Sequence, residues 1–157
     1  MTRYVRFTTI IGITTLSLLV VSCGVGGLTV TPSKTRVYVT NLESDTVSVI
    51  DLDTNAVVAE ILTGDAPSDV DITPNGALAY VTNSKHHHIS VIDVATNTVI
   101  TTVPLRTHPV GIAITPNGTH AYVTTIDDTV LAIDLSTHTV IATIPVKDHP
   151  WGIAITP

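Results

Sequence analysis

The chain has 157 residues, enough for one modest domain, and its formal net charge is −6 at pH 7. The single cysteine excludes an internal disulfide and any CxxC redox or haem-attachment site. Only seven residues are Lys or Arg, and they are scattered, so the composition disfavours binding to polyanions such as nucleic acid.

The first 23 residues have the pattern of a bacterial export signal. Arg3 and Arg6 lie in a short basic segment, and an uncharged apolar run follows over residues 7–21. That run is shorter than a typical membrane-spanning helix. It ends in the segment Val20 to Cys23, which resembles the lipobox of bacterial lipoproteins. The resemblance implies cleavage before Cys23 and lipidation of this residue.

We therefore expect a signal peptide over residues 1–22, and a lipidated N-terminus with a short tether over residues 23–26. The exported chain would be anchored to the cell envelope, and Gly24 favours the outer membrane in a Gram-negative cell. The alternatives are a simple secretory signal, which would leave the chain secreted or periplasmic, and an uncleaved anchor. Cleavage removes two arginines and no acidic residue, so the formal charge falls to −8.

The rest of the chain repeats one unit. Tyr38-Val39-Thr40-Asn41 returns at residues 80–83, and again as Tyr122-Val123-Thr124-Thr125, at a spacing of 42 residues each time. In the second copy, short alternating or β-branched runs predict strands. These runs are Val70–Thr73, Leu78–Thr82, Ile89–Asp93 and Thr98–Val103. A period of about 40–45 residues with four strands per copy is typical of a β-propeller blade.

Turn residues separate the predicted strands. Pro74-Asn75-Gly76 and Pro116-Asn117-Gly118 combine a fixed φ with a glycine that is free to take positive φ. Asp51, Asp93 and Asp134 each end a strand, and we expect their carboxylates to accept hydrogen bonds from turn amides. Because these aspartates recur in every copy, a catalytic role for them is disfavoured.

The sequence thus predicts an all-β fold of four-stranded antiparallel blades over residues 27–157. Three complete blades are expected at residues 27–62, 69–104 and 111–145, and the first strand of a fourth begins at residue 151. Such a ring is incomplete and leaves open blade faces. We expect either a piece of a longer protein or self-association through these faces, and an end within a blade favours the first.

The repeat resembles the YVTN-type β-propeller repeat proteins, which are named for the tetrapeptide at residues 38–41 and 80–83. The resemblance covers nearly all of residues 28–157 and extends to the segments at 109–116 and 150–157. It implies a secreted, surface-layer or envelope protein, and about seven blades in complete members. It implies no single chemistry, because one fold carries many functions.

Histidines are the first candidate site residues. His108 and His149 precede prolines in equivalent loops, and His86 and His88 lie in a loop that should open on the same face, because alternate loops of antiparallel strands return to one end. Imidazoles suit Zn²⁺ or Cu²⁺, so one hypothesis is a metal site. The alternative is that these histidines are solvated or extended loop residues.

Two further features depart from the repeat. Asp69 and Asp71 stand on an innermost strand where later copies have Gly111 and Ala113. They would face the central channel and hold a cation or water, or pair with a basic residue. Trp151 is a candidate partner contact, although packing against the adjacent blade is the commoner fate of such a residue.

From these observations we expect an envelope-anchored, noncatalytic scaffold that presents loops to a protein, glycan or small-ligand partner, with no evident cofactor. The alternative is a metal-binding, redox or hydrolytic module with histidines at the axial face. Nucleic acid is not an expected partner, because the charge is negative and aromatic residues are few.

Overall fold

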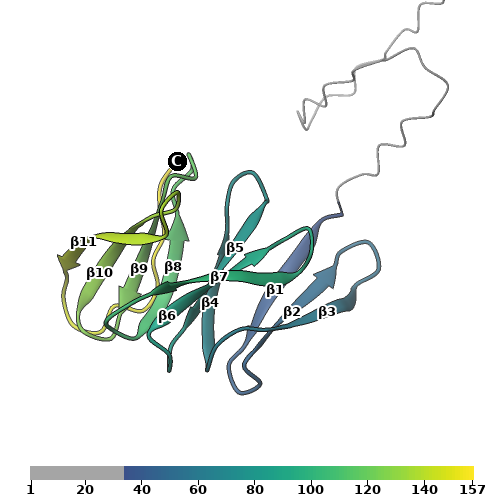
Figure 1. The fold of residues 1–157 in the computed structure, drawn as a ribbon, viewed down its shortest axis with the longest axis horizontal. Helices are drawn as coiled ribbons and strands as arrows, with labels where there is room; N and C mark the ends of the chain where they lie inside the picture. Colours follow the sequence, from purple (N-terminus) through teal and green to yellow (C-terminus); the bar gives the residue numbers. More distant parts are fainter. Residues whose placement is uncertain (1–33) are drawn as a thin grey trace, which may run out of the picture. The chain divides into compact units, whose positions relative to one another are not determined.

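The structure, a computed structural model, describes residues 34–157. These residues form β-strands grouped in three antiparallel sheets (Figure 1). The predicted signal peptide, Cys23, the tether and nearly all of the predicted first strand of the first blade lie outside the described residues. Within residues 34–157, no helix has the length and hydrophobicity needed to cross a bilayer.

Each sheet takes its strands in chain order, and every neighbouring pair is antiparallel. Blade 1 contains β1 (Arg36–Asn41), β2 (Thr46–Asp51) and β3 (Ala56–Leu62). Blade 2 contains β4 (Pro67–Ile72), β5 (Leu78–Asn83), β6 (His88–Asp93) and β7 (Thr98–Pro104). Blade 3 contains β8 (Pro109–Ile114), β9 (His120–Thr125), β10 (Thr129–Asp134) and β11 (Thr139–Pro145).

This arrangement confirms the predicted all-β fold of antiparallel blades in an incomplete ring. Blades 2 and 3 are four-stranded, and blade 1 has three strands within the described residues. The expected first strand of a fourth blade, residues 151–156, is not paired as a strand in the structure.

The innermost strands begin earlier than the sequence pattern indicates. β4 begins at Pro67 and β8 at Pro109, two residues before the expected blade boundaries. In both strands the pairing register shifts just after the proline. A β-bulge of this kind places an extra residue on one strand and interrupts the alternation of side chains. A search for simple alternation therefore places the strand start after the bulge.

The predicted turns form as expected. Gly76 and Gly118 both have φ of +69°, which glycine adopts without steric cost. Asp93 accepts hydrogen bonds from the amide and hydroxyl of Thr96, at 2.8 and 3.0 Å. Asp134 does the same for Ser136. These bonds stabilise the charged carboxylates and hold the pKa of both aspartates below the usual range.

Apolar side chains fill the space between adjacent blades. One core cluster joins Tyr38 and Val49 of blade 1 to Val81 of blade 2, and a second joins Tyr80 of blade 2 to Val123 of blade 3. Successive residues of β5 thus pack against opposite neighbours, as the alternation of a strand requires. Because both faces of this strand are covered, its residues from Ala79 to Asn83 are all buried.

The third residue of each tetrapeptide connects neighbouring blades. The Thr82 hydroxyl accepts the amide of Asp69 in its own blade at 3.1 Å, and donates to the carbonyl oxygen of Val110 in the next blade at 2.8 Å. Thr124 repeats this pattern with the Gly111 amide and the Trp151 carbonyl, at 2.8 and 3.0 Å. One hydroxyl therefore holds the bulge of its own blade and the backbone of the next.

The tyrosine of the tetrapeptide makes a second connection. The Tyr38 hydroxyl donates to Asn97 Oδ1 at 3.0 Å, and the Tyr80 hydroxyl lies 3.4 Å from His138 Nδ1. Asn97 and His138 occupy the same turn in successive blades, and both have φ of +54°. Each tyrosine thus packs into the core between two blades and reaches the outer turn of the following blade with its hydroxyl.

We predict that Thr82→Val destabilises the protein by about 1–3 kcal/mol, because the buried Asp69 amide and Val110 carbonyl lose their shared partner. Urea unfolding monitored by circular dichroism measures the change. The control is Thr102→Val on the exposed side of β7, which should change stability by less than about 0.5 kcal/mol. Equal effects of the two substitutions would contradict the role assigned to Thr82.

Candidate functional site

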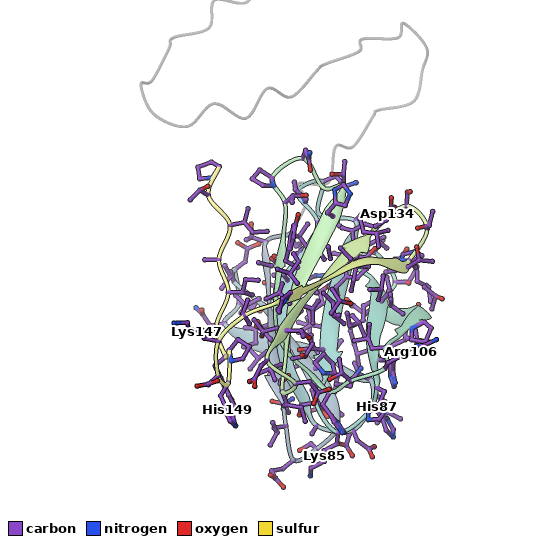
Figure 2. The ribbon with its side chains drawn as sticks, turned by 90° about the vertical axis from the view of Figure 1, so that its left-hand side faces the viewer. Lys85, His87, Arg106, Asp134, Lys147 and His149 are labelled. Atoms are coloured by element: carbon purple, nitrogen blue, oxygen red, sulfur yellow. The ribbon has the colours of Figure 1, made fainter. Side chains whose placement is uncertain are left out.

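Most histidines of the chain gather at one end of the blades. We call this the histidine end and define it by the loops at residues 42–45, 63–66, 84–87, 105–108, 126–128 and 146–149, together with His88 at the start of β6. It carries five of the seven histidines: His86, His87, His88, His108 and His149. Figure 2 shows Lys85, His87 and His149 at this end and Asp134 toward the opposite one. The grouping follows from the antiparallel meander, which returns every second loop to the same end.

A loop clamp recurs at this end in blades 1 and 3. Asp45 Oδ1 accepts the amide of Ala66 at 2.9 Å, and Asp128 Oδ1 accepts the amide of His149 at 2.8 Å. All four residues have positive φ, between 54° and 59°. In these two blades, an aspartate of the second hairpin therefore fixes the loop that leads to the next inner strand.

Blade 2 replaces this clamp with a pair of imidazoles. His87 occupies the repeat position of Asp45 and Asp128, and His108 occupies that of Ala66 and His149. Neither His87 nor His108 is among the residues with positive φ. Their Nε2 atoms lie 3.0 Å apart, with the rings nearly perpendicular at 84°.

His87 was not among the residues singled out from the sequence. The signal that could have identified it is the alignment of the copies, which places a histidine between two aspartates at one repeat position. His108 was predicted as a site residue, and its Nδ1 lies 2.9 Å from the Ser84 carbonyl oxygen. A ring nitrogen that faces a carbonyl carries the proton, so this contact fixes the tautomer of His108.

His86 and His88 lie on the other side of the same loop. His86 Nε2 lies 3.2 Å from Asp65 Oδ2, and its Nδ1 accepts the Asp65 amide at the same distance. Burial lowers the pKa of His88, and the nearby charge of His86 lowers it further. The Nε2 atom of His88 lies against Gly64, where an added Cβ would be 2.7 Å away.

The four predicted metal ligands are not brought together as one group. His149 extends into solvent beside its own clamp, while His86 and His88 lie toward Asp65 and His108 faces His87. Among residues 34–157, no three or more histidine, cysteine, aspartate or glutamate side chains are arranged to hold one metal ion. The structure does bring the ring centroids of His86 and His88 to 5.3 Å from each other, and it pairs His87 with His108.

A cleft of about 580 Å³ lies between blades 2 and 3, and the loop that precedes His108 forms part of its lining. Arg106 and Asp127 line it together with threonine hydroxyls, and Leu105, Leu131 and Val140 provide an apolar wall. The Thr107 hydroxyl donates to Asp127, which joins the two loops. Volume and lining suit a small ligand with polar groups, because ligand pockets commonly measure about 300–1,000 Å³. We call this space the Arg106 cleft.

Asp69 and Asp71 hold the backbone of the next blade. Asp69 Oδ2 accepts the amide of Ile112 at 2.9 Å, and Asp71 Oδ2 accepts the amide of Ile114 at 2.6 Å. The other oxygen of each carboxylate accepts the amide of the following residue in β4. The aspartates therefore satisfy the free inner edge of β8, a role that the sequence analysis did not identify. Their role as ligands of a cation stays a prediction.

Trp151 joins blade 3 through its backbone. Its carbonyl oxygen accepts the Thr124 hydroxyl, while its residue surface is 77% exposed. It also lines a small cavity of about 230 Å³ near Asp69 and Gly111. The side chain is thus accessible for the partner contact expected of it, and that contact stays a prediction.

Comparison with known proteins supports the fold and leaves the function open. Neither a protein-family model nor a curated protein matches the chain. Among solved structures, 915 chains match, one of them hydrazine synthase of Kuenenia stuttgartiensis. That match has a TM-score of 0.69 and 25% sequence identity. It covers 79% of this chain and 40% of the hydrazine synthase chain, so this chain spans well under half of that length.

We predict that Asp69→Ala combined with Asp71→Ala destabilises the protein by about 1–3 kcal/mol, because two amides of a buried strand lose their acceptors. Hydrogen exchange followed by mass spectrometry should show the loss of protection in β8. The control is Glu60→Ala, which removes an exposed carboxylate from β3. Unchanged protection of β8 in the double variant would contradict the assignment.

Proposed function

We propose that the protein is an envelope-anchored, noncatalytic β-propeller scaffold of the YVTN repeat type, which binds a protein, glycan or small-molecule partner at the histidine end. The observation that carries this proposal is the uneven distribution of departures from the repeat. Polar groups between the blades form hydrogen bonds with one another, whereas the loops of the histidine end carry different side chains in each copy.

The bonds between blades support a rigid platform. Thr82, Thr124, Tyr38 and the Asp69–Asp71 pair each satisfy a polar group of an adjacent blade. Within the described residues, no buried side-chain nitrogen or oxygen lacks a hydrogen-bond partner. Loops on a rigid scaffold vary without disturbing the core, which is the usual arrangement of binding surfaces.

The side chains at the histidine end support a polar contact surface. Lys85, Arg106 and Lys147 are all exposed there, and each stands at the tip of a loop. Blade 1 has Glu43 at the position of Lys85, and Gly64 at the position that Arg106 and Lys147 share, so these basic side chains belong to blades 2 and 3 and not to blade 1. Arg106 also lines the Arg106 cleft, so this cleft offers a ligand both a charged donor and an apolar wall.

The catalytic alternative has weaker support. The name of the hydrazine synthase match denotes an enzyme, but this chain spans 40% of that chain, and a shared propeller fold does not carry an activity with it. The metal-binding alternative has one specific observation in its favour, the pair His87 and His108.

We predict that the partner contacts the loop charges. A triple variant, Lys85→Ala, Arg106→Ala and Lys147→Ala, should lose at least ten-fold in affinity, because three exposed positive charges are removed from the loops of the histidine end. Ligands captured from envelope extract by the immobilised full chain are identified, and their affinity is then measured with each purified variant.

The control is Asp53→Ala, an exposed residue at the opposite end, where binding should change by less than two-fold. Circular dichroism establishes that both variants are folded. Finding no saturable ligand, or finding one that binds the triple variant as tightly as the unaltered chain, would overturn the proposal.

The predicted anchor has its own test. When the full chain is produced in a bacterium that processes lipoproteins, we expect mass spectrometry to find an acylated Cys23 at the mature N-terminus. Burial of acyl chains contributes about 0.8 kcal/mol per methylene, so two or three chains hold a protein stably on a membrane. The Cys23→Ser variant should leave the membrane fraction, and an unmodified Cys23 in the mature protein would contradict the anchor.

A further inference from the structure

We propose that His87 and His108 bind one divalent transition-metal ion, with Cu²⁺ preferred to Zn²⁺. The inference goes beyond the scaffold function, because the pair would bind metal whether or not a partner occupies the histidine end. It also differs from the site expected from the sequence, since His87 joins it and His86, His88 and His149 are not needed.

The separation of the two nitrogens suits a shared ion. Metal–imidazole bonds are about 2.0–2.1 Å long. Two such ligands at a right angle place their nitrogens about 2.9 Å apart, and a tetrahedral angle places them about 3.3 Å apart. The observed 3.0 Å between the Nε2 atoms lies close to the right-angle value. That angle is typical of tetragonal Cu²⁺, which also heads the affinity order of divalent ions.

The contact of His108 with Ser84 supports the same role. Its Nδ1 lies 2.9 Å from the Ser84 carbonyl oxygen and so carries the ring proton in the neutral form. The Nε2 lone pair is then directed at His87. A ligating histidine usually donates its other N–H to a backbone carbonyl or a carboxylate, which fixes ring orientation and raises the basicity of the ligand.

The repeat supplies an independent observation. At the two corresponding places, an aspartate bonds the loop amide, and both residues of each clamp have positive φ. Only blade 2 gives up this clamp. His87 replaces the aspartate, and His108 is the same residue type as His149 but lacks its positive φ. A hydrogen bond that fixes the loop was already available from aspartate. The replacement therefore favours a use for the His87 imidazole besides holding the loop.

The surroundings leave space for further ligands. The side chain of His87 is exposed and that of His108 is half-buried, so the remaining coordination positions face solvent. Water or a donor group of a partner would fill them. With two protein ligands, the site is open in the way that exchangeable and partner-bridging metals require.

The test is a calorimetric titration of the full chain with CuCl₂ and with ZnCl₂ in a non-coordinating buffer. The protein carries no polyhistidine tag, and Cys23 is alkylated in every sample. We expect one Cu²⁺ per chain, an electron paramagnetic resonance spectrum with nitrogen ligands, and weaker binding of Zn²⁺. His87→Asn and His108→Ala should each weaken Cu²⁺ binding by at least ten-fold.

Both substitutions are compatible with the fold, because the repeat itself places Asp and Ala at these positions, as in Asp45 and Ala66, and Asn closely matches Asp in shape. The control is His149→Ala, which should change affinity by less than two-fold. The same 3.0 Å would also fit a hydrogen bond between the two rings. That explanation prevails, and the proposal fails, if the unaltered chain binds no Cu²⁺, if His87→Asn retains its affinity, or if His149→Ala loses as much.

Discussion

The threonine hydroxyl of each tetrapeptide is the contact on which the arrangement of the blades depends. Thr82 accepts an amide from the bulged inner strand of its own blade and donates to the carbonyl oxygen of Val110 in the next. A bulge leaves backbone groups without a ladder partner, and a buried group of this kind is costly. A short side chain with one donor and free lone pairs satisfies both sides, so the bulge and the contact between blades form together.

Because the contacts between blades are specified by the repeat, the loops are free to vary. The turn aspartates, the Pro-Asn-Gly hairpins and the tyrosine bonds keep the same geometry from blade to blade. At the histidine end, by contrast, one position holds Asp45, His87 and Asp128 in turn. Variation in these loops costs little stability, so the repeated blades carry different side-chain chemistry at this end.

Asp69 and Asp71 illustrate a limit of inference from composition alone. Two carboxylates on an inner strand indicate a hydrated channel or a cation, since charges avoid apolar cores. In the fold, the two carboxylates instead accept hydrogen bonds from the free backbone amides of the neighbouring inner strand. The sequence shows that Gly111 and Ala113 replace these aspartates in the next copy, but not which edge the carboxylates meet. That depends on how far one blade is rotated from the next.

The sequence by itself determined the repeat of 42 residues, the strands and their turns, and the end of the blades at which the histidines lie. These features follow from local periodicity and turn chemistry, which act over a few residues. Only the tertiary structure decided that strands β4 and β8 start with a bulge, and that His108 meets His87 rather than His149. His87 and His108 are 21 positions apart, whereas His108 and His149 are one repeat apart, so which pair meets depends on how the loops and blades pack, and no local pattern carries that information.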